Sequence, residues 1–152
     1  MGRLAIVIGA GVALIAVQAS AASVKPGDVK IVDGELAQSL TGQPGDAASG
    51  RDLFMGRKQG NCLACHQNSD LKDQPYHGEV GPSMDGVADR WNEAQLRAIV
   101  VNSKKALHEE TIMPAFYKDA GFFRVAKKFA GASILNAQPV EDIVAYLNTL
   151  KE

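Results

Sequence analysis

The segment Cys62-Leu63-Ala64-Cys65-His66 constrains this chain of 152 residues more than any other part of its sequence. It holds both cysteines of the chain, two residues apart, with a histidine directly after the second. At this spacing the two thiols can form thioethers with the two vinyl groups of one haem, while the histidine faces the iron. The segment therefore predicts one covalently attached haem c, bound through Cys62 and Cys65, with His66 as an axial ligand of the iron.

Two other interpretations of this segment are a redox-active dithiol and half of a zinc site. A dithiol oxidoreductase would place the cysteine pair in an alternating strand–helix pattern, which the flanking sequence lacks, and it gives His66 no necessary role. A zinc site needs two further ligands, and the only other histidines are His77 and His108. Haem attachment is the interpretation that uses all three residues of the motif.

The first residues follow the three-part pattern of a secretory signal peptide. Met1-Gly2-Arg3 is a short positive start, Leu4 to Val17 is a run of apolar residues and glycine, and Ala19-Ser20-Ala21-Ala22 supplies small residues for cleavage. The run is shorter than the roughly 20 apolar residues that span a bilayer, which disfavours an uncleaved anchor. We therefore predict a signal peptide at residues 1–22 and a mature protein in the periplasm, where haem attachment of this kind takes place.

The net charge and the positions of the cysteines restrict the kinds of partner that the chain is expected to bind. A formal net charge of −1 gives no indication of nucleic-acid binding. No cysteine follows the apolar run to carry a lipid, so we expect no membrane attachment after signal cleavage.

The mature chain predicts an irregular arm followed by one all-α domain. Residues 23–45 are rich in proline and glycine and are expected to be extended or irregular. Residues 46–152 are expected to pack helices around the haem. The predicted helices are Asp46–Arg57, Asn92–Asn102 and Pro139–Lys151.

Capping residues and helical periodicity support these three helices. Asp46 is a plausible N-cap, and Asn92 with Gln95 can form a capping box. In the last helix Glu141 and Asp142 are expected to complement the helix dipole, and the apolar positions that follow the helical period are Val140, Ile143, Val144, Leu147 and Leu150. Residues 67–90 and 103–115 are expected to be loops, and the pattern of residues 116–136 is ambiguous.

A six-coordinate electron carrier needs a second axial ligand, often a methionine. The candidates are Met55, Met84, Met113, His77 and His108. Met55 lies on the helix that leads into the motif, and Met84 is only 18 residues after His66, which keeps it on the histidine side. Met113 is 47 residues after His66 and precedes Pro114, which stiffens its loop. We predict Met113 as the sixth ligand, and core or exposed loop positions for the others.

The chain resembles class I cytochromes c. Gly50, Phe54 and Tyr146 match the glycine and aromatic residues at the crossing of that family's first and last helices. Gly81-Pro82-Ser83-Met84-Asp85-Gly86 resembles its Gly-Pro-x-Leu-x-Gly turn. The resemblance implies that the Pro82 carbonyl accepts a hydrogen bond from Nδ1–H of His66. The run from Asn68 to His77 is longer and more polar than a minimal loop of the family.

A closer resemblance is to the SoxX family, the monohaem subunits of sulfur-oxidising SoxXA cytochromes. Its carrying segments are Ser39–Asp46, Gly60–His66, Leu96–Val100, Thr111–Tyr117, Ile134–Gln138 and Val140–Leu147. The resemblance implies a heterodimer with SoxA, which acts as an L-cysteine S-thiosulfotransferase that links thiosulfate to the SoxYZ carrier. The catalytic centre is then expected in SoxA, this chain has no catalytic residue of its own, and a soluble cytochrome c accepts the electrons.

The leading hypothesis is thus an electron-transfer subunit, and the alternative is a free soluble cytochrome c of a respiratory chain. A basic cluster either guides a redox partner or is a solvated face; its members are Lys104, Lys105, Arg124, Lys127 and Lys128. Candidate walls of the haem pocket are Leu63, Val80, Val87, Leu96, Ile99 and Phe116.

Overall fold

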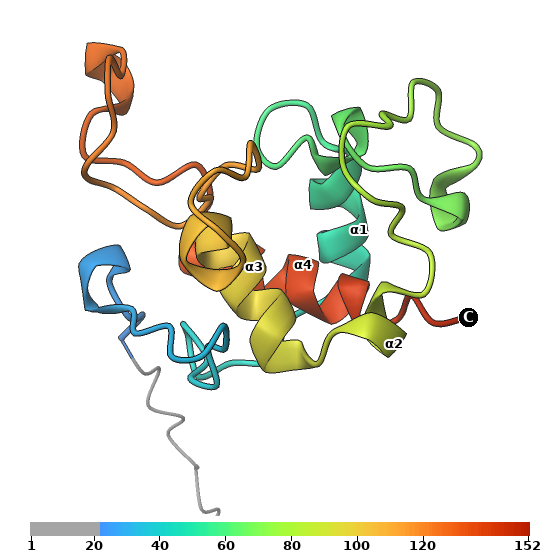
Figure 1. Cartoon of the computed structure of the whole chain (residues 1–152), viewed down its shortest axis with the longest axis horizontal. Helices are drawn as coiled ribbons and strands as arrows, with labels where there is room; N and C mark the ends of the chain where they lie inside the picture. The colour runs from blue at the N-terminus through green and yellow to red at the C-terminus, as the bar shows by residue number, and fades with distance from the viewer. Residues whose placement is uncertain (1–21) are drawn as a thin grey trace, which may run out of the picture.

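The computed structural model describes residues 22–152, so the signal peptide predicted at residues 1–22 lies outside the described residues except for Ala22. The helices are α1 (Ala47–Met55), α2 (Val87–Arg90), α3 (Glu93–Ala106) and α4 (Ala137–Leu147) (Figure 1). Short 3-10 turns are η1 (Pro26–Asp28), η2 (Cys62–Ala64), η3 (Ser69–Leu71) and η4 (Lys127–Phe129). The all-α prediction is confirmed, since the only β pairing in the described residues is the isolated bridge between Val32 and Glu35.

No helix within residues 22–152 is both long enough and apolar enough to span a membrane.

Helices α1 and α4 cross in direct backbone contact (Figure 1). A Cβ on Gly50 would lie 1.9 Å from the carbonyl oxygen of Asp142 and 2.8 Å from Cβ of Tyr146, so only glycine fits there. Beside it the rings of Phe54 and Tyr146 meet edge to face, with centroids 5.7 Å apart. All five apolar positions predicted for the last helix are buried. This crossing is the centre of the hydrophobic core.

Both predicted helix starts in the middle of the chain are confirmed. The Asp46 side chain accepts a hydrogen bond from the backbone N–H of Ser49, which caps α1. Asn92 and Gln95 form the reciprocal capping box of α3, with donor–acceptor distances of 2.9 and 3.0 Å.

The predicted ends of all three helices are wrong, and α1 ends at Met55 rather than at Arg57. Residue Asn102 has non-helical dihedrals (φ −155°, ψ 84°), but α3 continues beyond it to Ala106. Ser103, the next residue, is fully buried, and its hydroxyl donates a hydrogen bond to the carbonyl of Met113 outside the helix. Helix α4 begins at Ala137, earlier than expected, and ends at Leu147 rather than Lys151. Leu150 is still buried, and its carbonyl accepts a hydrogen bond from the backbone N–H of Ala88.

A buried ion pair ties the N-terminal arm to α3 and α4. Arg97 and Glu141 are each only 4% exposed, and Nε of Arg97 donates to both carboxylate oxygens at 3.1 Å. Glu141 also accepts from the backbone N–H of Leu40 at 2.7 Å, while Arg97 donates to the carbonyl of Leu36 at 3.1 Å. The expectation that Glu141 and Asp142 complement the helix dipole is wrong, because α4 begins at Ala137 and no acidic residue lies in its first turn. The carboxylate of Glu141 pairs with Arg97 instead.

The segment whose pattern was ambiguous is mostly a long loop that projects from the body of the molecule (orange, upper left in Figure 1). We call residues 118–133 the 118–133 loop; its only helical turn is η4. The base of the loop is closed by a hydrogen bond from the backbone N–H of Leu135 to the carbonyl of Phe116, at 2.9 Å.

Candidate functional site

The cysteine–histidine motif is wound into one tight turn after α1. Backbone N–H groups of Cys65 and His66 both donate to the carbonyl of Cys62, at 3.0 and 2.9 Å. Asn61 enters the turn in the left-handed conformation (φ 49°), and Gly60 is buried, with its Cβ position 3.2 Å from Sγ of Cys62. The 3-10 turn η2 and the two residues after it thus carry both thiols and the imidazole within five residues.

The imidazole of His66 has a fixed orientation. Its Nδ1 lies 2.7 Å from the carbonyl oxygen of Pro82, and because a carbonyl can only accept, Nδ1 carries the hydrogen. Nε2 then holds the free lone pair that a metal ligand needs. This is the hydrogen bond that the family resemblance implied, so that prediction is confirmed.

Two glycines let the turn before Pro82 lie flat against the motif. A Cβ on Gly81 would lie 2.3 Å from Cε1 of His66, and a Cβ on Gly78 would lie 2.0 Å from the carbonyl oxygen of Ala64. Their backbone N–H groups donate to the carbonyls of Cys65 and Leu63, at 2.8 and 2.9 Å. Any side chain at these positions would push the turn away and release the His66 ring.

The two cysteine thiols are free and differ in their surroundings. Cys65 is exposed, whereas burial raises the pKa of the half-buried Cys62 thiol to about 12. A thiol–disulfide oxidoreductase needs an attacking thiol with a lowered pKa. The raised pKa of Cys62 therefore argues against Cys62 as the attacking thiol of a dithiol site.

The loop that carries Met113 is held against α3 by hydrogen bonds. The hydroxyl of Ser103 donates to the carbonyl of Met113 at 2.7 Å. Further along, the backbone N–H of Phe116 donates to the carbonyl of Val100 at 3.3 Å. Met113 itself is half-buried and packs against the core.

The remaining ligand candidates are occupied or lie elsewhere. Met84 is only 8% exposed and belongs to the core, and Met55 is half-buried against it. The expectation that His77 is exposed is wrong: it is half-buried, Nδ1 accepts from the backbone N–H of Asn68 at 3.3 Å, and Nε2 lies 3.0 Å from the carbonyl of Leu71. His108 is exposed, as expected.

The predicted pocket walls separate into two groups. Leu63, Val87, Leu96 and Phe116 are buried and Ile99 is half-buried, but Val80 is 61% exposed. A cavity of about 340 Å³ lies against the outer side of the motif, between Leu63, Ala64, Pro75 and Tyr76. Its lining includes neither cysteine, nor His66, nor Met113, so it is not the place for a haem.

Several residues that support the site were missed by the sequence analysis. Asn68 is fully buried and donates to the hydroxyl of Tyr146 at 2.9 Å, and that hydroxyl donates to the carboxylate of Asp70 at 2.8 Å. Asp70 in turn accepts from Arg51 of α1 at 3.1 Å. These contacts hold the segment after the motif onto the helix crossing. No local pattern signals them, because the partners are up to 78 residues apart.

The donor set fits a haem c. Two free thiols, an imidazole with Nε2 available and a thioether are the groups that bind this cofactor in electron carriers. The side-chain oxygen of Asn102 is buried and has no hydrogen-bond partner among the described residues. The next residue, Ser103, donates the hydrogen bond that holds the Met113 loop. A polar acceptor left unsatisfied there is consistent with a group that the polypeptide does not itself supply.

The chain matches the cytochrome c family model over residues 47–151. A chain in the crystal structure of SoxXA from P. pantotrophus is 47% identical, and the alignment covers 86% of this chain and 99% of that one with a TM-score of 0.81. The c-type cytochrome SorU from Sinorhizobium meliloti is 24% identical over 69% of this chain and 90% of that chain, with a TM-score of 0.45. Ferric cytochrome c-550 from Paracoccus versutus is 24% identical over 71% and 99%, with a TM-score of 0.40. No curated protein sequence matches the chain.

Proposed function

Because the chain belongs to the cytochrome c family and so carries one covalently attached haem c, we propose that it is the electron-transfer subunit of a SoxXA-type sulfur-oxidising complex. Haem c supplies reversible one-electron transfer between ferric and ferrous iron when bound. The work of the polypeptide is to hold that group in a fixed, dry position and to present it to partners.

Four residues are proposed to hold the cofactor. Cys62 and Cys65 would form the two thioether links, and Nε2 of His66 and the thioether sulfur of Met113 would bind the iron. The observation that carries this proposal is the 2.7 Å contact between Nδ1 of His66 and the Pro82 carbonyl, which leaves Nε2 free to bind the iron. The soft sulfur of Met113 favours ferrous iron and raises the reduction potential.

The proposed partner is a SoxA subunit, with which this chain forms a heterodimer. The support is the 47% identity to a chain of SoxXA, over 99% of the length of that chain. In this proposal the complex acts as an L-cysteine S-thiosulfotransferase on the SoxYZ carrier, with its catalytic centre in SoxA. This chain takes up the electrons released there and passes them to a soluble cytochrome c, without a catalytic residue of its own.

The proposed location is the periplasm. The support is the signal-peptide pattern at residues 1–22 and the attachment of haem c after export.

The test of the cofactor site is expression with the haem-attachment machinery, followed by a pyridine haemochrome assay and mass spectrometry of the mature protein. We expect one haem per chain, a near-infrared band typical of methionine ligation, and loss of that band in Met113→Ala. Met55→Ala is the matched control and should keep the band. A mature polypeptide without haem would overturn the proposal, and a band that survives in Met113→Ala would exclude Met113 as the ligand.

Co-expression with the cognate SoxA-type subunit tests the assembly. A stable complex that elutes as one species supports the heterodimer. Elution of this chain only as a monomer, with its haem in place, would instead favour a free soluble electron carrier.

A further inference from the structure

We propose that the 118–133 loop is the surface by which this chain docks onto its partner haem subunit, through exposed aromatic side chains ringed by basic ones. This inference rests on the proposed heterodimer and adds the place of contact. It implies a partner surface with an apolar depression and acidic groups around it.

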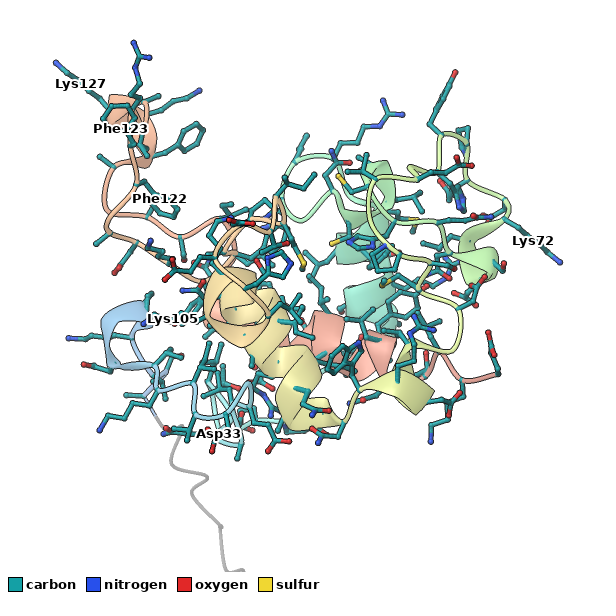
Figure 2. All side chains as sticks on the ribbon, in the orientation of Figure 1. Asp33, Lys72, Lys105, Phe122, Phe123 and Lys127 are labelled. Carbon is teal, nitrogen blue, oxygen red and sulfur yellow. The ribbon has the colours of Figure 1, made fainter. Side chains whose placement is uncertain are left out.

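The first observation is the exposure of large apolar side chains along the loop. The exposed fraction is 41% for Phe122, 90% for Phe123, 40% for Val125 and 57% for Phe129. Every residue from 120 to 132 is exposed. Figure 2 shows Phe123 and Phe122 on the projecting loop, with Phe123 nearer to its outer end. A concentration of apolar surface with no core beneath it marks an interaction site.

The second observation is the charge that accompanies these rings. The loop contains four basic residues and one acidic residue, Asp119, whereas the whole chain has a formal net charge of −1. Three of the cations stand over rings: Lys118 over Phe122 at 5.2 Å, Arg124 over Phe123 at 5.9 Å, and Lys128 over Phe129 at 4.8 Å. The matching partner surface is therefore acidic, and attraction between the two speeds and orients the encounter.

The third observation is the place of the loop in the chain. It begins directly after the segment Met113 to Tyr117, which is hydrogen-bonded to α3, and it is closed by the contact between Leu135 and Phe116. The loop is thus a projection on a fixed base next to Met113. Electron transfer falls steeply with distance, so a partner seated here would hold its redox centre on the Met113 side of the haem site.

A protein partner explains the loop better than a lipid surface does. A segment that lies in a membrane interface separates an apolar face from a basic face. Here cations and rings are interleaved, with a cation over each phenylalanine of the loop. Aromatic side chains with arginine nearby are the composition typical of energetic centres of protein interfaces.

The experiment uses the haem-loaded chain and the cognate SoxA-type subunit, with the dissociation constant measured by calorimetry. We expect Phe123→Ser to weaken binding at least about tenfold. Lys127→Glu with Lys128→Glu should raise the dissociation constant and make it less dependent on salt. The matched controls are Val32→Ser and Lys72→Glu, which change an exposed apolar and an exposed basic residue elsewhere and should leave binding unchanged. Haem absorption should be the same in all variants.

The outcomes separate the two proposals. If the wild-type chain does not bind the subunit, the proposed heterodimer fails and the docking surface fails with it. If wild type and Phe123→Ser bind equally well, the heterodimer stands and the docking surface is wrong. Sedimentation with vesicles of phosphatidylglycerol and phosphatidylethanolamine that depends on Phe123, together with unchanged binding to the subunit, would assign the loop to a lipid surface instead.

Discussion

The crossing of α1 and α4 and the 118–133 loop show opposite ways of using side chains. At the crossing, Gly50, Phe54 and Tyr146 are all buried, and beside it the buried Glu141 of α4 pairs with Arg97. In the loop, phenylalanines and lysines stand in solvent and contact mainly one another.

This difference indicates that the crossing keeps the site rigid and that the loop binds a partner. An electron carrier changes little in structure between its redox states only if the ligands are held by rigid surroundings, and the crossing with its hydrogen-bonded neighbours provides them on the His66 side. A partner surface must stay accessible, so its apolar residues stay outside the core. Substitutions at the crossing should therefore cost stability, and substitutions in the loop should cost binding alone.

The largest loss of stability is expected for Glu141→Gln. The change removes the charge that pairs with the buried guanidinium of Arg97, and breaking a buried pair in this way costs about 3 kcal/mol or more. Urea unfolding of the haem-loaded protein measures the loss. Glu93→Gln is the control, because Glu93 also contacts Arg97 but its side chain is 60% exposed, so that pair is worth about 0.5 kcal/mol or less. Equal losses in both variants would contradict the importance of burial.

The second-largest loss of stability is expected for Gly50→Ala. The added Cβ would lie 1.9 Å from the carbonyl oxygen of Asp142, so α1 and α4 must separate, at a cost of about 2–3 kcal/mol. A lower thermal midpoint of the haem-loaded protein is the readout. Gly27→Ala is the matched control, since nothing lies within 4 Å of its Cβ position. An unchanged midpoint in Gly50→Ala would mean that the helices do not touch there.

Tyr146→Phe should have a smaller effect that depends on pH. The variant loses the hydrogen bonds to Asn68 and Asp70, which together contribute about 1–2 kcal/mol at neutral pH. Burial, with the hydrogen bond to Asp70, raises the pKa of Tyr146. The phenol of the unfolded chain ionises near pH 10 while the folded one stays neutral, so wild-type stability falls as pH rises above about 10.

The variant lacks this ionisable group, and its stability should therefore fall less steeply in alkali. Unfolding measured between pH 7 and about pH 11 tests the slope. Tyr117, whose pKa is also raised by burial, keeps part of the dependence in both proteins. A gap between the two proteins that does not narrow in alkali would contradict this account.

Local signals in the sequence were enough to predict the starts of two helices and the turn that carries the site. Asp46 and the pair of Asn92 and Gln95 marked the helix starts because a cap contacts residues only three positions away. The motif predicted the grouping of Cys62, Cys65 and His66 because one turn makes it. The hydrogen bond from His66 to Pro82 was accessible only through the family resemblance, since nothing in the spacing alone reveals it.

Long-range contacts escaped prediction for the opposite reason. Arg97 and Glu141 are charges, which usually lie at the surface, and their burial depends on a partner 44 residues away. His77 was expected in solvent because its backbone partners are set by the fold of its loop. The continuation of α3 beyond Asn102 depends on the contact of Ser103 with Met113, which no helical pattern encodes.

The smallest effect on stability is expected for Phe123→Ser, which completes the contrast between the two regions. Phe123 is 90% exposed and Arg124 stands over its ring, so its loss should change the free energy of unfolding by no more than about 0.5 kcal/mol. Urea unfolding of the haem-loaded chain without its partner measures this. An exposed aromatic side chain that contributes little to the fold remains available for binding. A loss of stability comparable to that of Gly50→Ala would instead make the loop part of the structural core, and the division between a rigid crossing and an external binding surface would fail.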